Sequence, residues 1–399
     1  MTTSEEEPAT SPRRPISRRQ LLVAGGLGLV AAGLGQELAR GALAAPRHPQ
    51  ALIQPGVLRA GPGPAGEIDA PLPRLRAERT TLVNRMIGVG GPVATGQRWY
   101  VYGADLGHMF EHQGRIYLGF GDTFGPSSTY PFLAQPPSDW RSNSLAWLTR
   151  TRRPPATLGI EGFVTNRPGH AKQLLYSEKA PGDTTVIPTY GISLGRRMVL
   201  HYMSVNHFVS NIEWTLNYSG LAYSDDDGEH WVIPPAAVWP GNSRFGQVAM
   251  VGVDPFVYLF GVPAGRLGSV SLARVRAQDM VNLDAYEYWD GRRWQGQEQA
   301  AATMVPAPVG ELSVQWNSHY RAWLMTHQIV HEDRLVVRAA RHLTGPWGDP
   351  VTIATGHRWP SCYAPFLTPA WNDGPELFYT MTIYYPYAVY FMRTRLTAV

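Results

Sequence analysis

Cysteine is almost absent from this chain, which limits how the fold can be stabilised and which chemistry it can use. The 399 residues contain one cysteine, Cys362. A single thiol excludes an intrachain disulfide framework and a cysteine-based zinc site. We therefore interpret Cys362 as a small core residue. The sequence also lacks a Gly-x-Ser-x-Gly motif, so nothing in it indicates an activated serine nucleophile.

Long blocks of one charge sign are missing as well. Charged residues make up 17% of the chain, the formal net charge is +4, and no five basic residues follow one another. These features do not suit a nucleic-acid partner, so we expect none. Lysine occurs only at Lys172 and Lys179, so nearly all of the basic charge is arginine. This bias is typical of a GC-rich actinobacterial genome.

The one long apolar run lies near the N-terminus and indicates an export signal. A twin-arginine pattern at residues 17–22 precedes an apolar run at residues 21–35, and a small-residue cleavage site follows at residues 42–44. We expect residues 1–45 to be a twin-arginine signal peptide, with a membrane anchor as the alternative. We then expect a protein that is secreted or lies in the cell wall or periplasm, without stable membrane insertion, and that acts as a monomer.

Turn-forming and aromatic residues are abundant, and helical periodicity is scarce. The chain has 41 Gly, 34 Pro, 13 Trp, 19 Tyr and 12 Phe, a composition typical of all-β proteins. From residue 93 onward, aromatic-rich strands and turns recur in five loose copies of about 60 residues each. We expect residues 46–92 to be a Pro/Gly/Ala-rich linker and lead-in, and residues 93–399 to form a five-bladed β-propeller of four-stranded antiparallel blades. Six blades or a pair of β-sandwiches are the alternatives.

A local motif supports the propeller. Residues 224–231, SDDDGEHW, fit the pattern Ser-x-Asp-x-Gly-x-x-Trp of the Asp box, a hairpin turn found in sialidases and other propellers. We expect Asp226 to bond backbone amides, Gly228 to adopt a positive φ, and Trp231 to pack beneath the blade. The motif is structural, so we assign no catalytic role to its aspartates.

The stretch of residues 102–125, YGADLGHMFEHQGRIYLGFGDTFG, organises the rest of the chain. Two strands meet at a turn of Gln113 and Gly114, with Asp105 before the first strand and Asp122 after the second. A hairpin returns these positions to one edge of the sheet, so the two carboxylates can face one site. Glycosidic bond cleavage needs such a pair, one group to donate a proton and one to attack or to activate water. The alternative is two turn caps that bond their own backbone.

Three further polar residues lie where strands begin. Glu311 opens the fourth repeat as Asp105 opens the first, so we consider it a third catalytic carboxylate. Arg141 and Asn143 precede a strand and carry the donors and acceptors that hold sugar hydroxyls. The alternatives are a surface turn for Glu311 and a solvated loop for the other two.

Histidine and aromatic residues complete the expected substrate ligands. His108 and His201 lie in strand segments that could line the central funnel, and Trp316 and Tyr363 carry rings that stack on sugar faces. Packing within the core or between blades is the alternative for each. His108 and His112 are four residues apart, which on a strand separates them too far to share a metal ion, so we expect no metal site.

The chain resembles a bacterial family of endo-D-arabinanases, formerly a domain of unknown function, on a five-bladed propeller. The resemblance extends from residue 93 to the C-terminus. It implies endo-acting hydrolysis of α-linked D-arabinofuranose chains in arabinogalactan and lipoarabinomannan, the wall polymers of mycobacteria and relatives. It also implies that Asp105 in GADLG and Asp122 in GDT are the catalytic pair, and we expect no cofactor. The resembling segments are GADLGHMFEHQGRIYLGFGDTFG (103–125), WRSNSLAW (140–147), TVIPTYGISLG (185–195), HYMSV (201–205), NYSGLAYSDDDGEHW (217–231), YLFGVPAGRLGSVSLARV (258–275), GELSVQWN (310–317) and PYAVYFMRTRL (386–396).

Two other classes of function stay open. A non-catalytic, lectin-like propeller that binds cell-wall carbohydrate would keep aromatic platforms without needing both aspartates. A glycosidase of other specificity, of the sialidase or L-arabinanase type, is the second. A sialidase needs three arginines on the substrate carboxylate, and no arrangement in the sequence singles out three.

Overall fold

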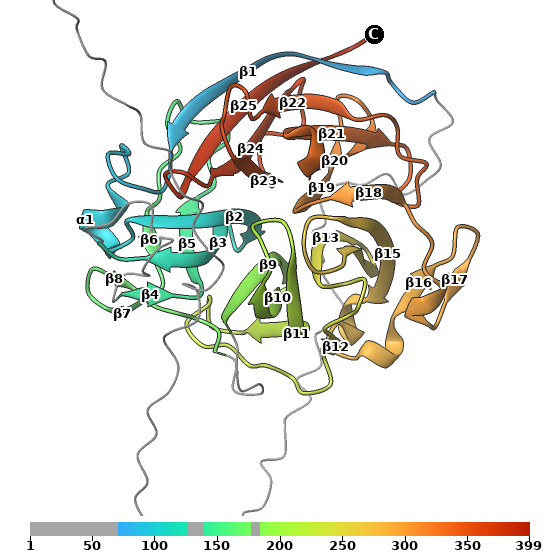
Figure 1. The fold of residues 1–399 in the computed structure, drawn as a ribbon, viewed down its shortest axis with the longest axis horizontal. Coiled ribbons are helices and arrows are strands. Elements are labelled where there is room, and N and C mark those ends of the chain that lie inside the picture. Colours follow the sequence, from blue (N-terminus) through green and yellow to red (C-terminus); the bar gives the residue numbers. More distant parts are fainter. Residues whose placement is uncertain (1–70, 127–138, 177–183) are drawn as a thin grey trace, which may run out of the picture. The chain divides into compact units, whose positions relative to one another are not determined.

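A computed structural model describes residues 71–126, 139–176 and 184–399 (Figure 1). The expected signal peptide, residues 1–45, and most of the expected linker lie outside the described residues. In the part that is described, strands joined by tight turns dominate, and no helix is long and apolar enough to cross a membrane.

Five antiparallel sheets follow one another along the chain and form the five blades of a propeller (Figure 1). This arrangement confirms the predicted fold. The blades consist of β2 (Gly103–His112), β3 (Arg115–Phe124), β5 (Ser144–Thr149) and β6 (Gly162–Phe163); β9 (Thr185–Leu194), β10 (Arg197–Phe208), β11 (Trp214–Ser224) and β12 (Val238–Pro240); β13 (Gln247–Val253), β14 (Phe256–Val262), β15 (Gly268–Arg276), β16 (Glu287–Trp289) and β17 (Trp294–Gln295); β19 (Leu312–Asn317), β20 (Ala322–Ile329), β21 (Arg334–Ala340) and β22 (Val351–Thr355); and β23 (Cys362–Leu367), β24 (Glu376–Ile383), β25 (Ala388–Ala398) and β1 (Leu75–Arg85).

Not every blade keeps to four strands. The third blade extends to the hairpin β16–β17, and β18 (Val305–Val309) pairs with β15 at the side. In the first blade, β4 (Trp140–Arg141) pairs with β3, and β7 (Thr165–Arg167) and β8 (His170–Ala171) form a small separate sheet. The short elements are α1 (Thr95–Trp99), η1 (Ala277–Asp279), η2 (Leu283–Ala285), η3 (Glu298–Ala300) and η4 (Val330–Glu332).

The ring closes with a strand from the N-terminal side. β1 pairs antiparallel with β25 from Leu75 opposite Ala398 to Arg85 opposite Tyr390, so it is the outer strand of the fifth blade. Part of the expected lead-in, residues 46–92, is therefore propeller structure. The polar and apolar alternation of this strand is weak in the sequence, because register shifts between Ala77 and Arg79 and between Leu82 and Asn84 interrupt its two-residue period.

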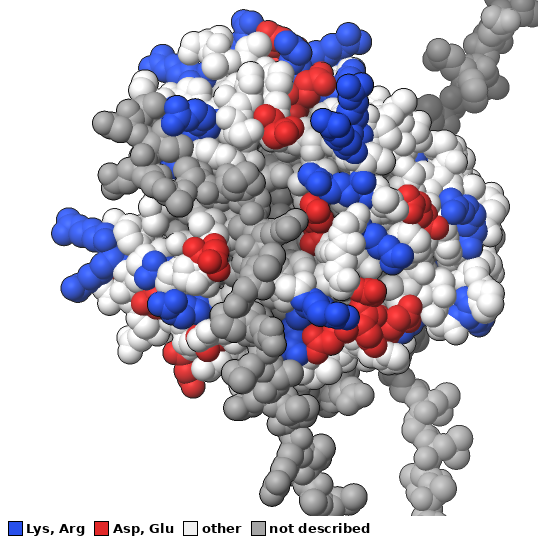
Figure 2. Space-filling model, turned by 180° about the vertical axis from the view of Figure 1, so that it is seen from behind, with Lys and Arg blue, Asp and Glu red and all other residues white. Residues whose placement is uncertain are grey.

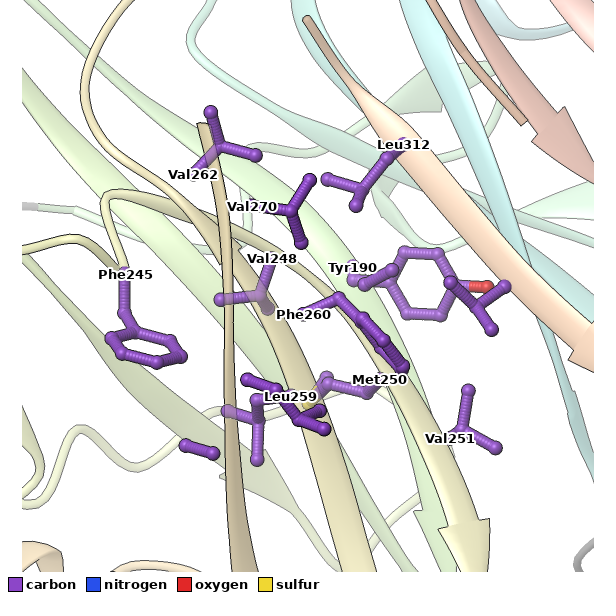
Figure 3. Packing of buried hydrophobic residues seen from close by; sticks show 14 of the residues in the cluster. Tyr190, Phe245, Val248, Met250, Val251, Leu259, Phe260, Val262, Val270 and Leu312 are labelled. Carbon is purple, nitrogen blue, oxygen red and sulfur yellow. The ribbon is translucent and has the colours of Figure 1, made fainter. Parts of the chain in front are cut away.

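The innermost strands place the start of each blade around one axis. β2, β9, β13, β19 and β23 contact one another in this order, and β23 contacts β2 again. Apolar side chains fill the space between the blades, as around β13 and β14 in Figure 3, where Phe260 and Leu259 are fully buried. Burial of each such side chain contributes about 1.5–3 kcal/mol. Cys362 is buried in this way too, as predicted.

The Asp box has the predicted hydrogen bonds. An Asp226 carboxylate oxygen accepts from the backbone amide of His230 at 2.9 Å, and Gly228 has a φ of 90°. The Trp231 indole donates to the carbonyl of Gly228 at 2.9 Å and packs against the core between the first and second blades. The Asp box therefore stabilises the turn at residues 224–231.

Charge is dispersed over one face of the molecule. On the face shown in Figure 2, basic and acidic side chains lie interspersed, and among the described residues neither sign forms a continuous patch.

Candidate active site

The predicted hairpin is present and brings Asp105 beside Asp122. Gln113 and Gly114 both have positive φ, 47° and 80°, as a two-residue hairpin turn requires. The pairing shifts between Ala104–Thr123 and Leu106–Phe120, so Asp105 lies opposite the two residues Gly121 and Asp122. Both aspartates therefore lie inside strands at a β-bulge, rather than outside the strand ends as expected. Bulges re-aim side chains and are frequent next to active sites.

A local kink orients Asp105. The next two residues, Leu106 and Gly107, have φ of 64° and 82°, which is unusual for leucine. Threonines of β24 hold this conformation. Thr382 accepts a hydrogen bond from the Leu106 amide at 3.0 Å, and Thr380 donates to the Gly107 carbonyl at 2.9 Å.

Gly121 provides the space in which the Asp105 carboxyl group lies. A Cβ atom on Gly121 would be 2.4 Å from Asp105 Oδ1 and 3.3 Å from a methyl carbon of Ile187. Only a glycine lets the carboxyl group approach β3 so closely. The approach brings the group next to the backbone that carries Asp122.

Asp105 is set up to hold a proton near neutral pH. Burial raises its pKa from 3.8 to about 7, and the charge of Asp122 acts in the same direction. Its Oδ2 accepts from the Tyr363 hydroxyl at 3.0 Å, and hydrogen bonds from Tyr363 and Tyr387 oppose the rise. Its Oδ1 is buried and has no hydrogen-bond partner among the described residues. An unpaired buried oxygen is costly when charged, which favours the protonated acid.

Asp122 is the more readily ionised member of the pair. Its Oδ1 accepts from the Thr185 hydroxyl at 2.6 Å and from the Trp140 indole N–H at 3.0 Å. Burial raises its pKa to about 6, and these two donors oppose the rise because they favour the charged form. Because both pKa values are raised, the pair can share one proton near neutral pH, with one carboxyl group protonated and the other ionised. General acid–base cleavage requires this combination.

Glu311 lies near the pair but is engaged in an ion pair. Arg266 Nε is 3.0 Å from each Glu311 oxygen, and Arg266 Nη2 is 2.6 Å from Oε1. The guanidinium balances the charge of Glu311 and contacts both of its oxygens. The expected role of Glu311 as a third carboxylate of the site stays a prediction. Its charge still reaches Asp105, whose pKa it raises slightly.

Three expected substrate ligands make hydrogen bonds within the protein. The Arg141 guanidinium donates to the carbonyls of Ala171 and Tyr100 at 2.9 and 2.8 Å. Asn143 is fully buried, and its amide makes four hydrogen bonds to backbone groups of residues 174, 175 and 186. His201 is buried between the Thr189 hydroxyl and the Phe245 carbonyl. These side chains make their hydrogen bonds inside the protein, except that Arg141 Nε is buried and has no partner among the described residues. That they bind sugar stays a prediction.

His108 is also in the interior. Its ring stacks on Tyr190 and meets the edge of Phe366, and burial lowers its pKa to about 3. Neither ring nitrogen has a hydrogen-bond partner among the described residues. His108 is thus a neutral core residue beneath the hairpin rather than a surface ligand.

The two expected aromatic platforms lie in different surroundings. Trp316 is half-buried on β19 and pairs with Trp323 across the hairpin. Tyr363 is buried, and the Arg266 guanidinium covers its ring at 4.5 Å. Tyr363 therefore belongs to the site through its hydroxyl, while its ring is not free to stack on a sugar.

Several site residues were not found from the sequence. Arg266, Thr185 and Tyr387 lie in ordinary turn and strand contexts, and no local signal marks them. Trp140 and Tyr385 are exposed by 39% and 54%, and both adjoin the site. Trp140 does so through its bond to Asp122, and Tyr385 through ring contacts that lead by Tyr384 to Tyr363. Exposed aromatic residues of this kind suit contact with sugar rings.

A metal centre has no candidate ligand cluster in this part of the chain. Among the described residues, no group of three or more His, Cys, Asp or Glu side chains lies close enough together to hold an ion.

Comparison with known proteins defines the family. The model of the family described as "Domain of unknown function (DUF4185)" matches residues 90–393, so the chain belongs to this family. Notoamide biosynthesis cluster protein J of Aspergillus sp. (strain MF297-2) is 29% identical over 284 residues, which cover 65% of this chain and 73% of that protein.

Solved structures are similar in fold. A crystal structure of a Bacteroides ovatus ATCC 8483 protein matches with a TM-score of 0.55 and 16% identity, over 75% of this chain and 87% of that chain. A family 117 glycoside hydrolase from Zobellia galactanivorans matches with a TM-score of 0.45 and 12% identity, over 81% of this chain and 91% of that chain. The Bacteroides ovatus match shows a shared fold alone.

Proposed function

We propose that this member of the DUF4185 family is a glycoside hydrolase that uses Asp105 and Asp122 as its catalytic pair. The observation that carries the proposal is the β-bulge, which places Asp105 opposite Gly121 and Asp122. Burial raises the pKa of both carboxyl groups, to about 7 for Asp105 and about 6 for Asp122. Like charges close together cannot both be stable in a buried site, so one group keeps a proton. Paired carboxyl groups of unequal pKa are the machinery of glycosidic cleavage.

The roles follow from the surroundings of each group. Asp105, with a pKa of about 7, is the general acid. It gives its proton to the glycosidic oxygen as the bond from that oxygen to the anomeric carbon breaks. Asp122, with a pKa of about 6, is ionised at the same pH and acts as the base that activates water, or as the nucleophile. In either case, water supplies the hydroxyl on the anomeric carbon. If Asp122 is the nucleophile, Asp105 takes a proton back from the attacking water; if Asp122 is the base, it receives that proton, and exchange with solvent returns both groups to their starting states.

The proposed substrate is D-arabinan, cleaved internally at α-D-arabinofuranosyl linkages of arabinogalactan or lipoarabinomannan. Support comes from the resemblance of the sequence segments to endo-D-arabinanases and from the exposed ring of Trp140, whose indole N–H donates to Asp122. We also propose export by the twin-arginine pathway, action outside the cytoplasmic membrane as a monomer, and no need for a cofactor. The twin-arginine pattern supports the export route.

Product analysis on purified mycobacterial arabinogalactan tests the proposal. Wild type, Asp105→Asn, Asp122→Asn and the exposed control Asp284→Asn are compared. We expect wild type and the control to release a ladder of arabinan oligosaccharides, and each site variant to lose at least about 100-fold in rate.

Three other results would change the conclusion. A ladder that survives both site substitutions would remove the pair from the mechanism. Cleavage of another glycan, with arabinan left intact, would change the specificity to that of another glycosidase. Binding of arabinan without cleavage by wild type would assign a lectin-like role.

A further inference from the structure

Four blades meet in one chain of contacts that ends at Asp105. Glu311, directly before β19, pairs with Arg266 of the β14–β15 connection. The Arg266 guanidinium lies 4.5 Å from the ring centre of Tyr363 in β23, and the Tyr363 hydroxyl donates to Asp105 Oδ2 of β2 at 3.0 Å. Arg266 also donates to the carbonyl of Asn211. The side chains of Arg266 and Glu311 are only 11% and 7% exposed, so solvent screens them little.

We propose that Arg266 and Glu311 are positioning residues of the catalytic site, which hold Tyr363 against Asp105 and balance the charge beside its carboxyl group. The proposal rests on the proposed function of the aspartate pair. Neither residue touches the reacting atoms. Their effect passes through Tyr363 and through the electric field at Asp105.

The geometry supports both parts of this role. A planar guanidinium that pairs with both carboxylate oxygens has little freedom, so it fixes the plane on which the phenol ring packs. Trp214 flanks the guanidinium, at 5.3 Å from its ring centre. Tyr363 itself lies between Ser361 and Ala364, which both have positive φ, and the pairing of β23 is irregular at this point. Side-chain contacts, more than a regular strand, therefore determine where the hydroxyl lies.

The charges at Asp105 come from several elements and act in both directions. The titratable and charged groups that face it are Asp122 of β3, Tyr363 of β23, Tyr384 and Tyr387 of the β24–β25 turn, Glu311 before β19, and Arg266. Glu311 raises the pKa of Asp105, and Asp105 in turn raises the pKa of Arg266. By reciprocity, the Arg266 cation favours the ionised form of Asp105, so the two members of the ion pair act in opposite directions.

Opposite substitutions should therefore move the protonation of Asp105 in opposite directions. Glu311→Gln leaves the Arg266 cation unbalanced, so the alkaline limb of the pH–rate profile should move down by about one pH unit. Arg266→Met leaves the Glu311 carboxylate unbalanced, so this limb should move up by a similar amount. The double variant removes both charges, and its limb should return close to that of wild type. Tyr363→Phe removes a donor that favours the ionised form, so its limb should move up.

A second measurement does not depend on activity. The protein is labelled with ¹³C at the aspartate carboxyl carbons, and the Asp105 signal is assigned by its loss in Asp105→Asn. We expect its titration midpoint to follow the directions given for the kinetic limb. If the titration midpoint of Asp105 shifts in the variants but no glycan is cleaved, the positioning role of Arg266 and Glu311 is supported and the proposed function is rejected. Cleavage with unmoved midpoints would do the reverse.

Melting temperatures identify variants that fail to fold. If either charge variant unfolds, Tyr363→Phe and the double variant carry the test, because neither leaves a buried charge without its partner. The proposal is overturned if Tyr363→Phe leaves the limb and the midpoint where wild type has them, if the double variant moves them as far as a single charge variant does, or if both single charge variants move them in the same direction. If the ion pair were purely structural, its removal would lower the stability of the protein without shifting the pH–rate profile or the Asp105 titration midpoint in this pattern.

Discussion

Replacement of Asp105 by asparagine should stabilise the protein at alkaline pH while it abolishes catalysis. In the folded protein, the Asp105 pKa is about 7, against 3.8 for the unfolded reference. For an acid with a raised folded-state pKa, stability is complete below the unfolded pKa and is lost as the pH rises from 3.8 to about 7. A rise of about three units corresponds to about 4 kcal/mol of unfolding free energy at pH 8.

The assay compares urea denaturation at pH 3.5 and pH 8 for wild type, Asp105→Asn and the exposed control Asp284→Asn. Asparagine keeps an oxygen that accepts from Tyr363, and any fixed cost of its new amide group cancels between the two pH values. We expect the stability of Asp105→Asn relative to wild type to be about 4 kcal/mol more favourable at pH 8 than at pH 3.5. The control should differ by less than about 0.5 kcal/mol. If wild type and Asp105→Asn lose the same stability between these pH values, Asp105 carries no retained proton and cannot be the general acid proposed.

Two further predictions concern activity. The rate should rise with pH as Asp122 ionises near its pKa of about 6 and fall as Asp105 loses its proton near its pKa of about 7, so a pH–rate profile with its maximum outside this window would contradict the assigned roles. Gly121→Ala should displace the Asp105 carboxyl group, because the new Cβ would lie 2.4 Å from Oδ1, and should lower kcat/KM by about 100-fold. Gly159→Ala adds a methyl group to open space and is the matched control; equal activity of the two variants would show that the close approach at Gly121 is unimportant.

Local patterns in the sequence were sufficient for the main features of the fold. Each blade is built from neighbouring strands joined by short turns, so strand and turn signals recur along the chain and can be counted. The hairpin of β2 and β3 depends on a two-residue turn at Gln113 and Gly114, and a hairpin brings its two ends together without help from the rest of the protein. The proximity of Asp105 and Asp122 could be predicted for this reason.

Contacts between distant segments could not be predicted in this way. Asp105 and Tyr363 are 258 positions apart, and β1 reaches the last blade only when the ring closes. Polar residues in similar sequence contexts have different positions in the structure. Asn143 is buried in the core, while Asp122 faces the site. The sequence alone does not distinguish these cases, because the partners that satisfy each group come from other strands or blades.

By itself, the sequence determined the five-bladed all-β fold, the Asp box and the hairpin that pairs the two aspartates, since each of these depends on residues close together in the chain. Only the tertiary structure decided that Glu311 pairs with Arg266, that the Tyr363 hydroxyl bonds to Asp105, and that burial raises the pKa of both aspartates. The physical reason is that burial and neighbouring charge set a pKa, and both arise when ring closure brings strands of different blades together around one carboxyl group.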